Sequence, residues 1–536
     1  MGVNGLLRFL KKCSRHVNIS DFKGYTVAVD AYCWIHRASF SCAMDLALGN
    51  PTDQYIKYCL KLLNVILAAG VRPILVFDGA DLPAKSETNA KRHSSKRTYR
   101  EKAAQFLLEG NRKAAQECFE KCIEVTPEMA RAVIKAVRDQ GVDCIVSPYE
   151  SDAQLAYLVQ AGYADLVVTE DSDLLMFGCK QIIFKLDLTG SGVLVTWSAG
   201  IGEQCCGIPS KDFSHASLRC MGVLSGCDYF PGIPRIGLAT AAKVSLLHIS
   251  SSGGAVGGRI KCSSKLHEET IRAALRAERT FRLQVVFDPK SRRRLRLTEP
   301  TIDDIKEERI ALLDADLPDD QLFSYAGDDS IDASLSCAIA LANVDFYTGE
   351  QVDTFDPEHF KVRHLFTAPK LPQGAFEESS NVNRIQACSP IKSILKKVHR
   401  PDGERLNKSI WNKDYKLEPV WLHYTSGAGS QPRPFCISLE DSKTDQLENG
   451  FCQNHETGMV KPVDPLPAAA PSKAQLRLVA GEVVHRNHRV FAPSVLTGEP
   501  AVLRRDLTRN GKCEESSAEE DVRIKGYIAF KVVRLL

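Results

Sequence analysis

Short apolar runs alternate with longer amphipathic stretches over the first two hundred residues. The runs at 25–30 and 73–78 each end in an aspartate, and further runs lie at 142–146 and 165–169. Continuous apolar runs of this length are typical of strands that are buried on both faces of a parallel sheet. We therefore expect four strands of one sheet in this part of the chain.

Helices are predicted between these strands. Apolar residues at three- and four-residue spacings predict a helix over 55–66 that ends near Gly70. Thr126 followed by Pro127 predicts the N-cap and first position of a second helix, and a third begins at Ser151. Repeated strand–helix–strand units predict an α/β fold, with a mainly parallel twisted sheet flanked by helices.

The rest of the chain divides by composition. Residues 79–126 are polar, basic and free of strand candidates, which predicts a helical insertion within an α/β core at 1–200. Residues 201–350 predict a mainly helical subdomain with a Pro/Gly-rich turn, followed by an acidic stretch, 301–332, interpreted as a solvated flank. Residues 351–536 hold 14 of the 25 prolines and no sustained period, so we expect a largely disordered tail. Its short apolar pieces, 409–411 and 527–533, are candidate partner-binding segments.

Composition excludes few classes of protein. Apolar residues make up 44% and charged residues 25%, which is ordinary globular usage, and a net charge of +3 by itself indicates no partner. The 18 cysteines are scattered singly, which favours reduced thiols over a disulfide framework. Because no run of about 18 apolar residues occurs, we expect a soluble intracellular protein without a membrane span.

Acidic residues stand where the predicted strands end and where the helical part begins. They are Asp30, Asp78, Glu150, Asp152, Asp171, Asp173 and Asp228. The carboxyl ends of parallel strands share one edge of a sheet, where open α/β folds bind ligands. Crowded carboxylates repel unless cations neutralise them, and oxygen ligands alone favour a hard ion, Mg²⁺ or Mn²⁺. Two such ions would bind a scissile phosphate for phosphodiester hydrolysis. Each acid taken alone could instead be a helix N-cap or a turn residue.

Basic residues gather within the insertion. Residues 85–102 carry seven bases and two acids, and Lys85, Arg92, Lys96 and Arg100 are spaced to form one stripe on a helix. Such a stripe opposite an acidic metal site could hold the phosphates of a strand, or it could be a solvated helix face.

Two other features have open interpretations. Tyr32 and His36 follow Asp30 closely enough to touch a base near the metal edge, or they could be packed core aromatics. The basic run at 290–296 could contact duplex phosphates or form an exposed strand.

Several segments resemble a known family. They are MGVNGLL, VAVDAYCWIHR, ILVFDG, YESDAQLAYL, TEDSDLL, LSGCDY and IGLATAAKV. Over residues 1–350 the chain resembles the flap endonuclease (XPG/Rad2-like) superfamily of structure-specific 5′ nucleases. The resemblance implies a PIN-like 5′-nuclease core, a mobile helical arch at 79–126 and a helix-two-turn-helix DNA-binding subdomain.

The resemblance also implies an activity. It implies a 5′-to-3′ double-strand DNA exonuclease with 5′-flap endonuclease activity, which works as a monomer in the nucleus in DNA mismatch repair and DNA-end resection. Its implied substrates are double-stranded DNA with nicks, gaps, ends or 5′ flaps, and its implied partners are mismatch-repair proteins and the sliding clamp. The alternatives are a flap or junction endonuclease of the same superfamily, or a catalytically impaired DNA-binding scaffold.

Residue roles follow from the same resemblance. The seven acids would hold two Mg²⁺ ions, directly or through water, while Lys85 and Arg92 would position the scissile phosphate, helped by Lys96 in binding DNA. Tyr32 and His36 would meet the unpaired DNA end. A potassium ion would be held by carbonyl oxygens near Ser225, Gly232 and Ile236.

The chain departs from the family pattern in the helix-two-turn-helix element. Arg235 replaces the first glycine of the usual Gly-Ile-Gly, which puts a side chain where backbone meets phosphate, and a glycine-rich stretch at 253–258 replaces sequence expected to be helical.

Overall fold

The computed structural model describes residues 2–197, 200–251, 265–312, 318, 321–362 and 408–417. These residues all belong to one compact unit. Within them the cysteines are free thiols, as predicted, and no helix is long and apolar enough to cross a membrane.

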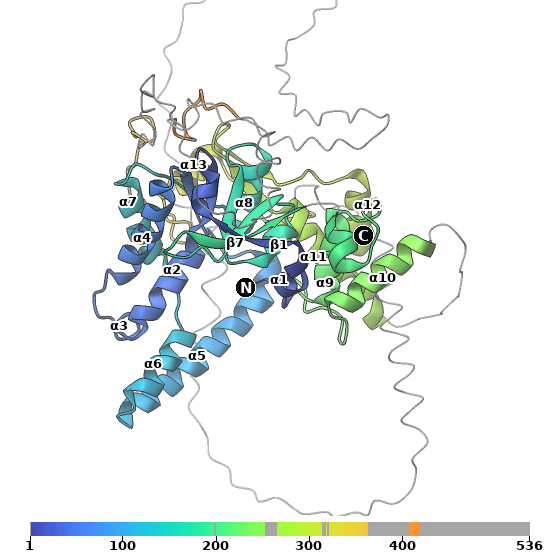
Figure 1. Ribbon diagram of the computed structural model, residues 1–536, viewed down its shortest axis with the longest axis horizontal. Helices are drawn as coiled ribbons and strands as arrows, with labels where there is room; N and C mark the ends of the chain where they lie inside the picture. Colours follow the sequence, from blue (N-terminus) through green and yellow to red (C-terminus); the bar gives the residue numbers. More distant parts are fainter. Residues whose placement is uncertain are drawn as a thin grey trace, which may run out of the picture. The chain divides into compact units, whose positions relative to one another are not determined.

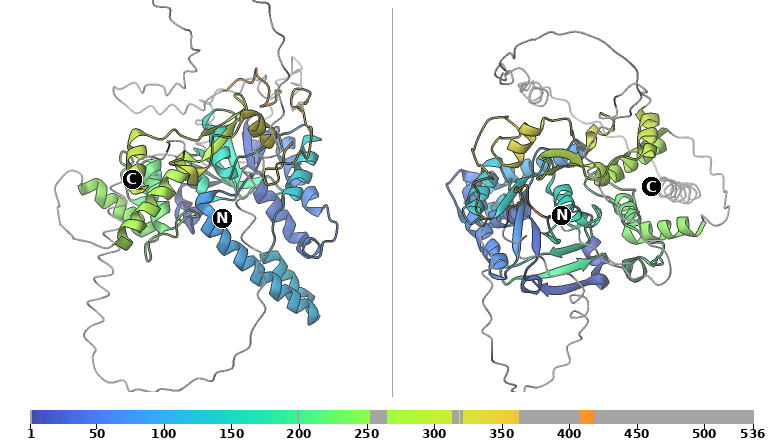
Figure 2. Two further views of the ribbon diagram at one scale, coloured as in Figure 1. Left: turned by 180° about the vertical axis from the view of Figure 1, so that it is seen from behind. Right: turned by 90° about the horizontal axis from the view of Figure 1, so that it is seen from above.

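Seven strands of the described chain form one sheet in the order β1-β7-β6-β5-β2-β3-β4 (Figures 1 and 2). Their bounds are β1 Ser14–Asn18, β2 Thr26–Asp30, β3 Arg72–Phe77, β4 Asp143–Val146, β5 Leu166–Thr169, β6 Gln181–Phe184 and β7 Ser191–Thr196. Strands β6, β5, β2, β3 and β4 run parallel, and β7 and β1 pair antiparallel at one side. The predicted fold class and the four predicted strands are confirmed, whereas β1, β6 and β7 were not predicted.

Helices cover both faces of this sheet. The helices are α1 Leu6–Phe9, α2 Ala31–Ser39, α3 Ala43–Leu48, α4 Gln54–Ala68, α5 Ser86–Leu108, α6 Arg112–Lys121, α7 Pro127–Arg138, α8 Ser151–Gln160, α9 His215–Ser225, α10 Leu238–Ser251, α11 Lys265–Leu283, α12 Ile302–Leu312 and α13 Ala333–Ala340. Val27 and Val29 face a core shared with α2, α4 and α7, while Ala28 faces a core shared with α8. This alternation follows the two-residue period of a strand, and it explains why each strand is apolar throughout.

The predicted N-cap signal of α7 works as expected. The Thr126 side chain accepts a hydrogen bond from the Met129 backbone N–H, and Pro127 takes the first helical position, where its missing N–H costs nothing. The resulting helix presents Val133 and Val137 to the sheet, both buried.

The insertion at 79–126 is helical and contains no strand, as predicted. Helices α5 and α6 extend away from the sheet as an antiparallel pair, called the arch below (Figure 1). Gly110, with φ of +74°, makes the turn between them, and Ala103, Ala115 and Phe119 form a small core with Ala43 of α3.

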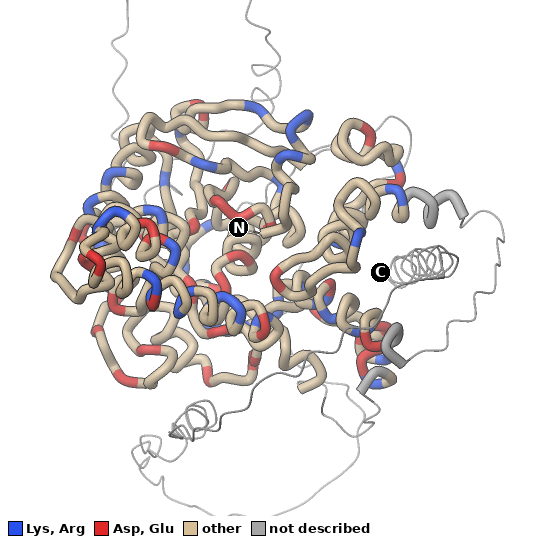
Figure 3. Tube along the Cα trace, turned by 90° about the horizontal axis from the view of Figure 1, so that it is seen from below, with Lys and Arg blue, Asp and Glu red and all other residues tan. Residues whose placement is uncertain are grey.

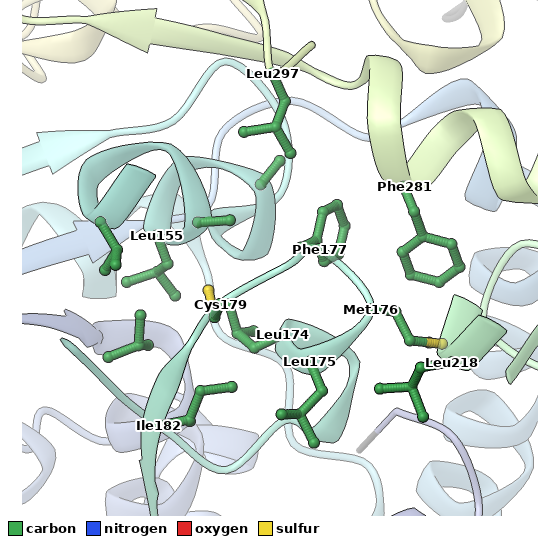
Figure 4. Packing of buried hydrophobic residues seen from close by; sticks show 14 of the residues in the cluster. Leu155, Leu174, Leu175, Met176, Phe177, Cys179, Ile182, Leu218, Phe281 and Leu297 are labelled. Carbon is green, nitrogen blue, oxygen red and sulfur yellow. The ribbon is translucent and has the colours of Figure 1, made fainter. Parts of the chain in front are cut away.

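The helical part packs on the same core as α8. Figure 4 shows Leu155 of α8, Met176, Leu218 of α9 and Phe281 of α11 within one cluster of buried side chains. One hydrophobic core therefore includes residues on both sides of position 200, and the domain boundary placed there stays a prediction.

The basic run at 290–296 belongs to a hairpin. Strands β8 (Val285–Asp288) and β9 (Arg293–Arg296) pair antiparallel, and the buried Arg296 guanidinium lies 3.2 Å from Asp329. Of the two open interpretations, a strand is therefore confirmed, although its last arginine is buried rather than exposed.

The interpretation of 301–332 as a solvated flank is wrong for the inner face of α12, although Asp303 and Lys306 on its outer face are exposed. Glu308 is fully buried and its carboxylate lies 2.6 Å from Arg279 of α11, while Asp304 lies 2.6 Å from Arg282. The acids are paired because basic residues recur every three positions on α11, opposite the acidic face of α12.

The tail predictions fall mostly outside the described residues. The disorder that we expect over 351–536 can be compared with the structure only at 351–362 and 408–417. The candidate segment 527–533 lies outside the described residues. The glycine-rich stretch at 253–258 also lies outside them. The other candidate segment, 409–411, packs on the core of this chain, and its binding to a partner stays a prediction.

Candidate metal and nucleic-acid site

The predicted acids lie at one edge of the sheet because the strands that precede them are parallel and end in register. Asp30 of β2 pairs with Val76 of β3, and Phe77 pairs with Val146 of β4. Asp78 follows at the end of β3 and accepts a hydrogen bond of 2.8 Å from the Ser151 backbone N–H. The chain turns at each of these ends, so the carboxylates project from the same edge.

Several of these acids also have a local structural role. Asp30 caps α2 by accepting a bond from the Cys33 N–H, and Glu150 is the N-cap residue of α8, with Asp152 in its first turn. Asp171 caps a short 3₁₀ turn, Ser172–Leu175, by accepting a bond of 3.0 Å from the Asp173 N–H. The capping alternative is thus correct for Asp30 and Asp171, and it does not remove them from the edge.

The electrostatics show that the acids form one cluster. Burial raises the pKa of Asp152 well above its usual range, and the negative charges of Asp171, Asp30 and Glu150 raise it further. Burial, followed by the charge of Asp30, raises the pKa of Asp78 to about 6. The edge therefore carries more negative charge than its surroundings neutralise.

Asp173 and Asp228 connect the helical part to this cluster. Burial raises the pKa of Asp173 well above its usual range, and Asp171 and Asp228 add to the effect. Asp228 lies just after α9, and its charge, with those of the six other predicted acids, belongs to one set of mutual electrostatic effects at the end of the sheet.

Two of the predicted bases neutralise part of this charge. Lys85 pairs with Glu150 and lies 2.9 Å from Asp228, and Arg92 donates to the Asp228 carboxylate at 2.7 Å. Burial of Asp228 opposes its ionisation, but Lys85 and Arg92 outweigh burial and lower its pKa. Lys85 and Arg92 thus lie at the acidic edge, as the sequence analysis expected.

The donor set fits a hard divalent cation. In the part of the chain that the structure describes, no three His, Cys, Asp or Glu side chains are already gathered as a finished metal site, and Glu150 and Asp228 are bound to Lys85 instead. The cluster nevertheless offers only carboxylate oxygens, several of them buried and short of positive charge. Such a set suits Mg²⁺ or Mn²⁺ better than a softer ion.

The basic stripe divides into two groups. Lys85 is the residue before α5, and it turns with Arg92 toward Asp228. Lys96 and Arg100 instead face Glu124, at 3.8 and 3.7 Å. Figure 3 shows basic and acidic residues mixed over the arch.

His36 and Tyr32 lie on α2 beside the acidic edge. His36 lines a cleft of about 720 Å³ bounded by α2, the N-terminal segment 2–8 and Lys185. Burial lowers its pKa, and Lys96 and Arg92 lower it further. Tyr32 packs partly against the core under α2, and burial and then Asp78 raise its pKa. The structure thus supports the packed-aromatic alternative for Tyr32, which still borders Asp78.

The N-terminal segment completes the acidic edge, and sequence reasoning did not assign it there. The Val3 backbone N–H donates to Asp173 at 2.6 Å. A Cβ at Gly2 would lie 2.2 Å from an Asp171 oxygen, and φ at Gly2 is +79°. The signal in the sequence was the pair Gly2 and Gly5, since both adopt a left-handed conformation.

Two further contacts were not predicted. The Tyr229 hydroxyl donates to Glu150, and the Thr88 hydroxyl donates to the Asp228 carbonyl at 2.7 Å. Both tie the edge to the arch or to the helical part. No pattern in the sequence distinguishes them from ordinary polar residues.

The proposed potassium element is compactly folded. Gly232 has φ of +81°, and a Cβ there would lie 2.8 Å from the Ser225 carbonyl carbon. Ile236 is buried just before α10. Arg235 is exposed with φ of +70°, so it adopts the left-handed conformation that a glycine in this position would adopt without strain.

Two family models match the chain. The XPG N-terminal domain matches residues 1–99 and the XPG I-region matches residues 141–228, so the matches contain all seven acids of the edge. Over these two ranges the chain is similar to the XPG family.

Within that family, the similar curated proteins are named for an exonuclease. Exonuclease 1 from Xenopus laevis is 41% identical over 75% of this chain and 53% of its own length, and Exonuclease 1 from Danio rerio is 40% identical over 70% and 44%. Exodeoxyribonuclease 1 from Schizosaccharomyces pombe is 35% identical over 56% of this chain and 52% of its own length. The chain spans about half the length of the curated relatives that it matches.

Proposed function

We propose that the protein is a Mg²⁺-dependent 5′-to-3′ exodeoxyribonuclease with 5′-flap endonuclease activity. The observation that carries the proposal is the cluster of seven carboxylates at one sheet edge, beside a basic arch. The names of its relatives agree with this activity. The resemblance to this family adds the expectation of a role in DNA mismatch repair and end resection in the nucleus, with mismatch-repair proteins and a sliding clamp as partners.

The carboxylates of the edge would hold the ions. They are Asp30, Asp78, Glu150, Asp152, Asp171, Asp173 and Asp228, and Mn²⁺ would be accepted in place of Mg²⁺. Bound ions would supply Lewis-acid stabilisation of the charge that develops on a phosphodiester during hydrolysis. Potassium would bind near Ser225, Gly232 and Ile236, held by backbone carbonyls.

Lys85 and Arg92 would orient the scissile phosphate. Both lie where the arch meets the edge, and both already bind an anionic oxygen, that of Asp228. A phosphodiester accepts charge-assisted hydrogen bonds from arginine and lysine as a carboxylate does, so an incoming strand can share or replace these contacts. Lys96, farther along α5, would bind the backbone of the strand rather than the reacting group.

His36 would receive the unpaired end, whereas Tyr32 packs under α2. The cleft of about 720 Å³ opens beside His36 and has Arg8, Arg37 and Lys185 in its lining, which suits a nucleotide with its phosphate. Arg37 is paired with Glu170 at 2.5 Å, so Arg8 and Lys185 are better placed than Arg37 to meet a phosphate.

The experiment uses the full chain with Mg²⁺ on two substrates, a duplex with a 3′ overhang and a 5′-flap duplex, labelled so that stepwise and single-cut products separate. Mononucleotides released from the recessed 5′ end are expected. Flap excision alone would assign a flap endonuclease, and binding without any product would assign a scaffold.

A variant pair tests the site itself. Asp171→Ala or Asp173→Ala should abolish cleavage and leave DNA binding largely intact, because ion binding and backbone contact use different groups. Asp53→Ala, an exposed acid paired only with Lys57, is the matched control and should cleave normally. Cleavage by both edge variants at the control's rate would refute the assignment.

A further inference from the structure

Residues 408–417, called the clip below, dock on the described core although they lie far along the chain from it (orange in Figure 1). Ile410 is fully buried, and Trp411 and Tyr415 are 4% and 3% exposed. All three belong to the hydrophobic core that contains α8 and the helical part. The burial of two aromatic side chains and one aliphatic side chain in a ten-residue segment is the pattern of an anchored peptide.

The aromatic anchors have specific partners. Tyr415 stacks on Tyr163 with ring centroids 5.7 Å apart, and its hydroxyl donates to the Tyr163 carbonyl at 3.1 Å. Trp411 packs on Phe287 of β8 at 6.0 Å. The Arg72 guanidinium lies over the Tyr415 ring at 5.3 Å. The groove that receives the clip is therefore lined by aromatic and cationic groups that select aromatic side chains.

The clip also completes a buried ion pair. Arg72 and Asp143, the first residues of β3 and β4, lie 2.6 Å apart with side chains 2% and 0% exposed. Ser409 Oγ donates to Asp143 at 2.6 Å, and the Ile410 N–H donates to the same carboxylate at 3.3 Å. A buried carboxylate needs its remaining oxygen sites satisfied, so the clip provides donors that the core by itself does not place there.

The groove lies at the edge of the sheet away from the candidate site. Arg72 and Asp143 begin the strands after which Asp78 and Glu150 follow, so a strand's length separates the clip from the carboxylates. The clip is joined to the preceding described residue, Val362, by residues 363–407. A linker of this length gives a tethered peptide an effective concentration of the order of millimolar, so a moderate intrinsic affinity keeps the groove filled.

We propose that the clip is a tethered peptide ligand of the nuclease unit, recognised through its Ser-Ile-Trp sequence and the tyrosine four residues after the tryptophan. It fastens the chain beyond residue 417 to the edge opposite the carboxylates. A partner segment of the same chemistry would bind there only by displacing the clip.

A cleavable full-length chain tests the proposal. A recognition site for a specific protease is inserted between residues 385 and 386, the chain is cut, and the fragments 1–385 and 386–536 are run on a sizing column at 1 µM. The two fragments should co-elute because the clip holds them together. Trp411→Ala with Tyr415→Ala should weaken the association at least about a hundredfold and separate them. Trp421→Ala, a tryptophan outside the clip, is the matched control and should leave the fragments together.

A peptide covering residues 404–420 distinguishes loss of the ligand from unfolding of the groove. Labelled peptide should bind the uncut double variant, whose groove is empty, and should bind the wild-type chain far more weakly, because the tethered clip competes. Separation of the wild-type fragments, co-elution of the double-variant fragments, or equal binding of peptide to both chains would overturn the proposal. DNA cleavage is not the readout, so failure here would leave the proposed nuclease function untouched.

Discussion

Asp171→Asn should stabilise the metal-free protein while abolishing its activity. Burial raises the pKa of Asp171 to about 6, against the ordinary value of 3.8. The difference means that ionisation of this carboxylate destabilises the folded state by about 3 kcal/mol relative to the unfolded chain. Asparagine removes the charge and can still accept the capping bond from the Asp173 N–H through its amide oxygen. We therefore expect a gain in the free energy of unfolding of about 1 to 3 kcal/mol at pH 7.5. The lower values apply because the ionisation of Asp171 is coupled to that of the neighbouring acids.

The sign of the pH dependence follows from the raised pKa. Between about pH 4 and pH 6 the unfolded chain has released the Asp171 proton and the folded chain still holds it, so wild-type stability falls as the pH rises through this window. Below this pH window Asp171 is neutral in both the folded and the unfolded chain, so Asp171→Asn gains no stability over the wild type. The advantage of Asp171→Asn should thus be full above pH 6 and absent near pH 4.

The measurement is urea unfolding of wild type and variant in excess chelator at pH 4.0, 5.0, 6.0 and 7.5. Asp53→Asn, an exposed acid, is the control and should stay within about 0.5 kcal/mol of wild type at each pH. Adding Mg²⁺ should stabilise the wild type more than Asp171→Asn, because the ion replaces the missing positive charge. A variant that is less stable than wild type at pH 7.5, or a gain that does not change with pH, would refute this reasoning.

Three further outcomes are expected. Glu308→Ala should lower the free energy of unfolding by about 1.5 to 3 kcal/mol, as measured by urea unfolding, because it removes the buried carboxylate 2.6 Å from Arg279 while Glu307 and Asp304 still pair with that guanidinium. Glu124→Gln should tighten DNA binding about two- to fivefold at low salt, measured by fluorescence anisotropy in chelator, since this carboxylate faces the basic groups of α5; unchanged affinity would contradict it. Gly79→Ala should destabilise by about 2 to 4 kcal/mol in thermal unfolding, because a Cβ would lie 2.0 Å from the Ser147 carbonyl oxygen.

The acids of the candidate site could be found from sequence because position in the chain determines position in space for parallel strands. Asp30 ends one buried run and Asp78 follows another, so their shared edge follows from the fold class alone. Lys85 was also found, but as part of a helical stripe, whereas it precedes α5 and reaches the edge from a turn. Spacing alone does not show where a helix begins.

The contacts that were missed join residues that no local pattern connects. Val3 donates to Asp173 across 170 positions, and Glu308 pairs with Arg279 of another helix. An acidic segment looks solvated when it is read alone, because the bases that neutralise it lie elsewhere in the chain. Strands β6 and β7 were missed for a different reason, since a hairpin turn at 185–190 joins them and the alternation of strand and helix does not mark them.

The candidate site is divided between carboxylates that the protein neutralises and carboxylates that it does not. Lys85 and Arg92 lower the pKa of Asp228 despite its burial, whereas the pKa values of Asp152 and Asp173 are raised. The uncompensated charge is thus concentrated around Asp152 and Asp173, so a divalent cation would gain most by binding there. Lys85 and Arg92 could then bind another anion, because an ion at Asp228 would neutralise that carboxylate in their place. Their positive charges would then face the phosphate of a bound strand, which links ion binding to substrate binding without any movement of the sheet.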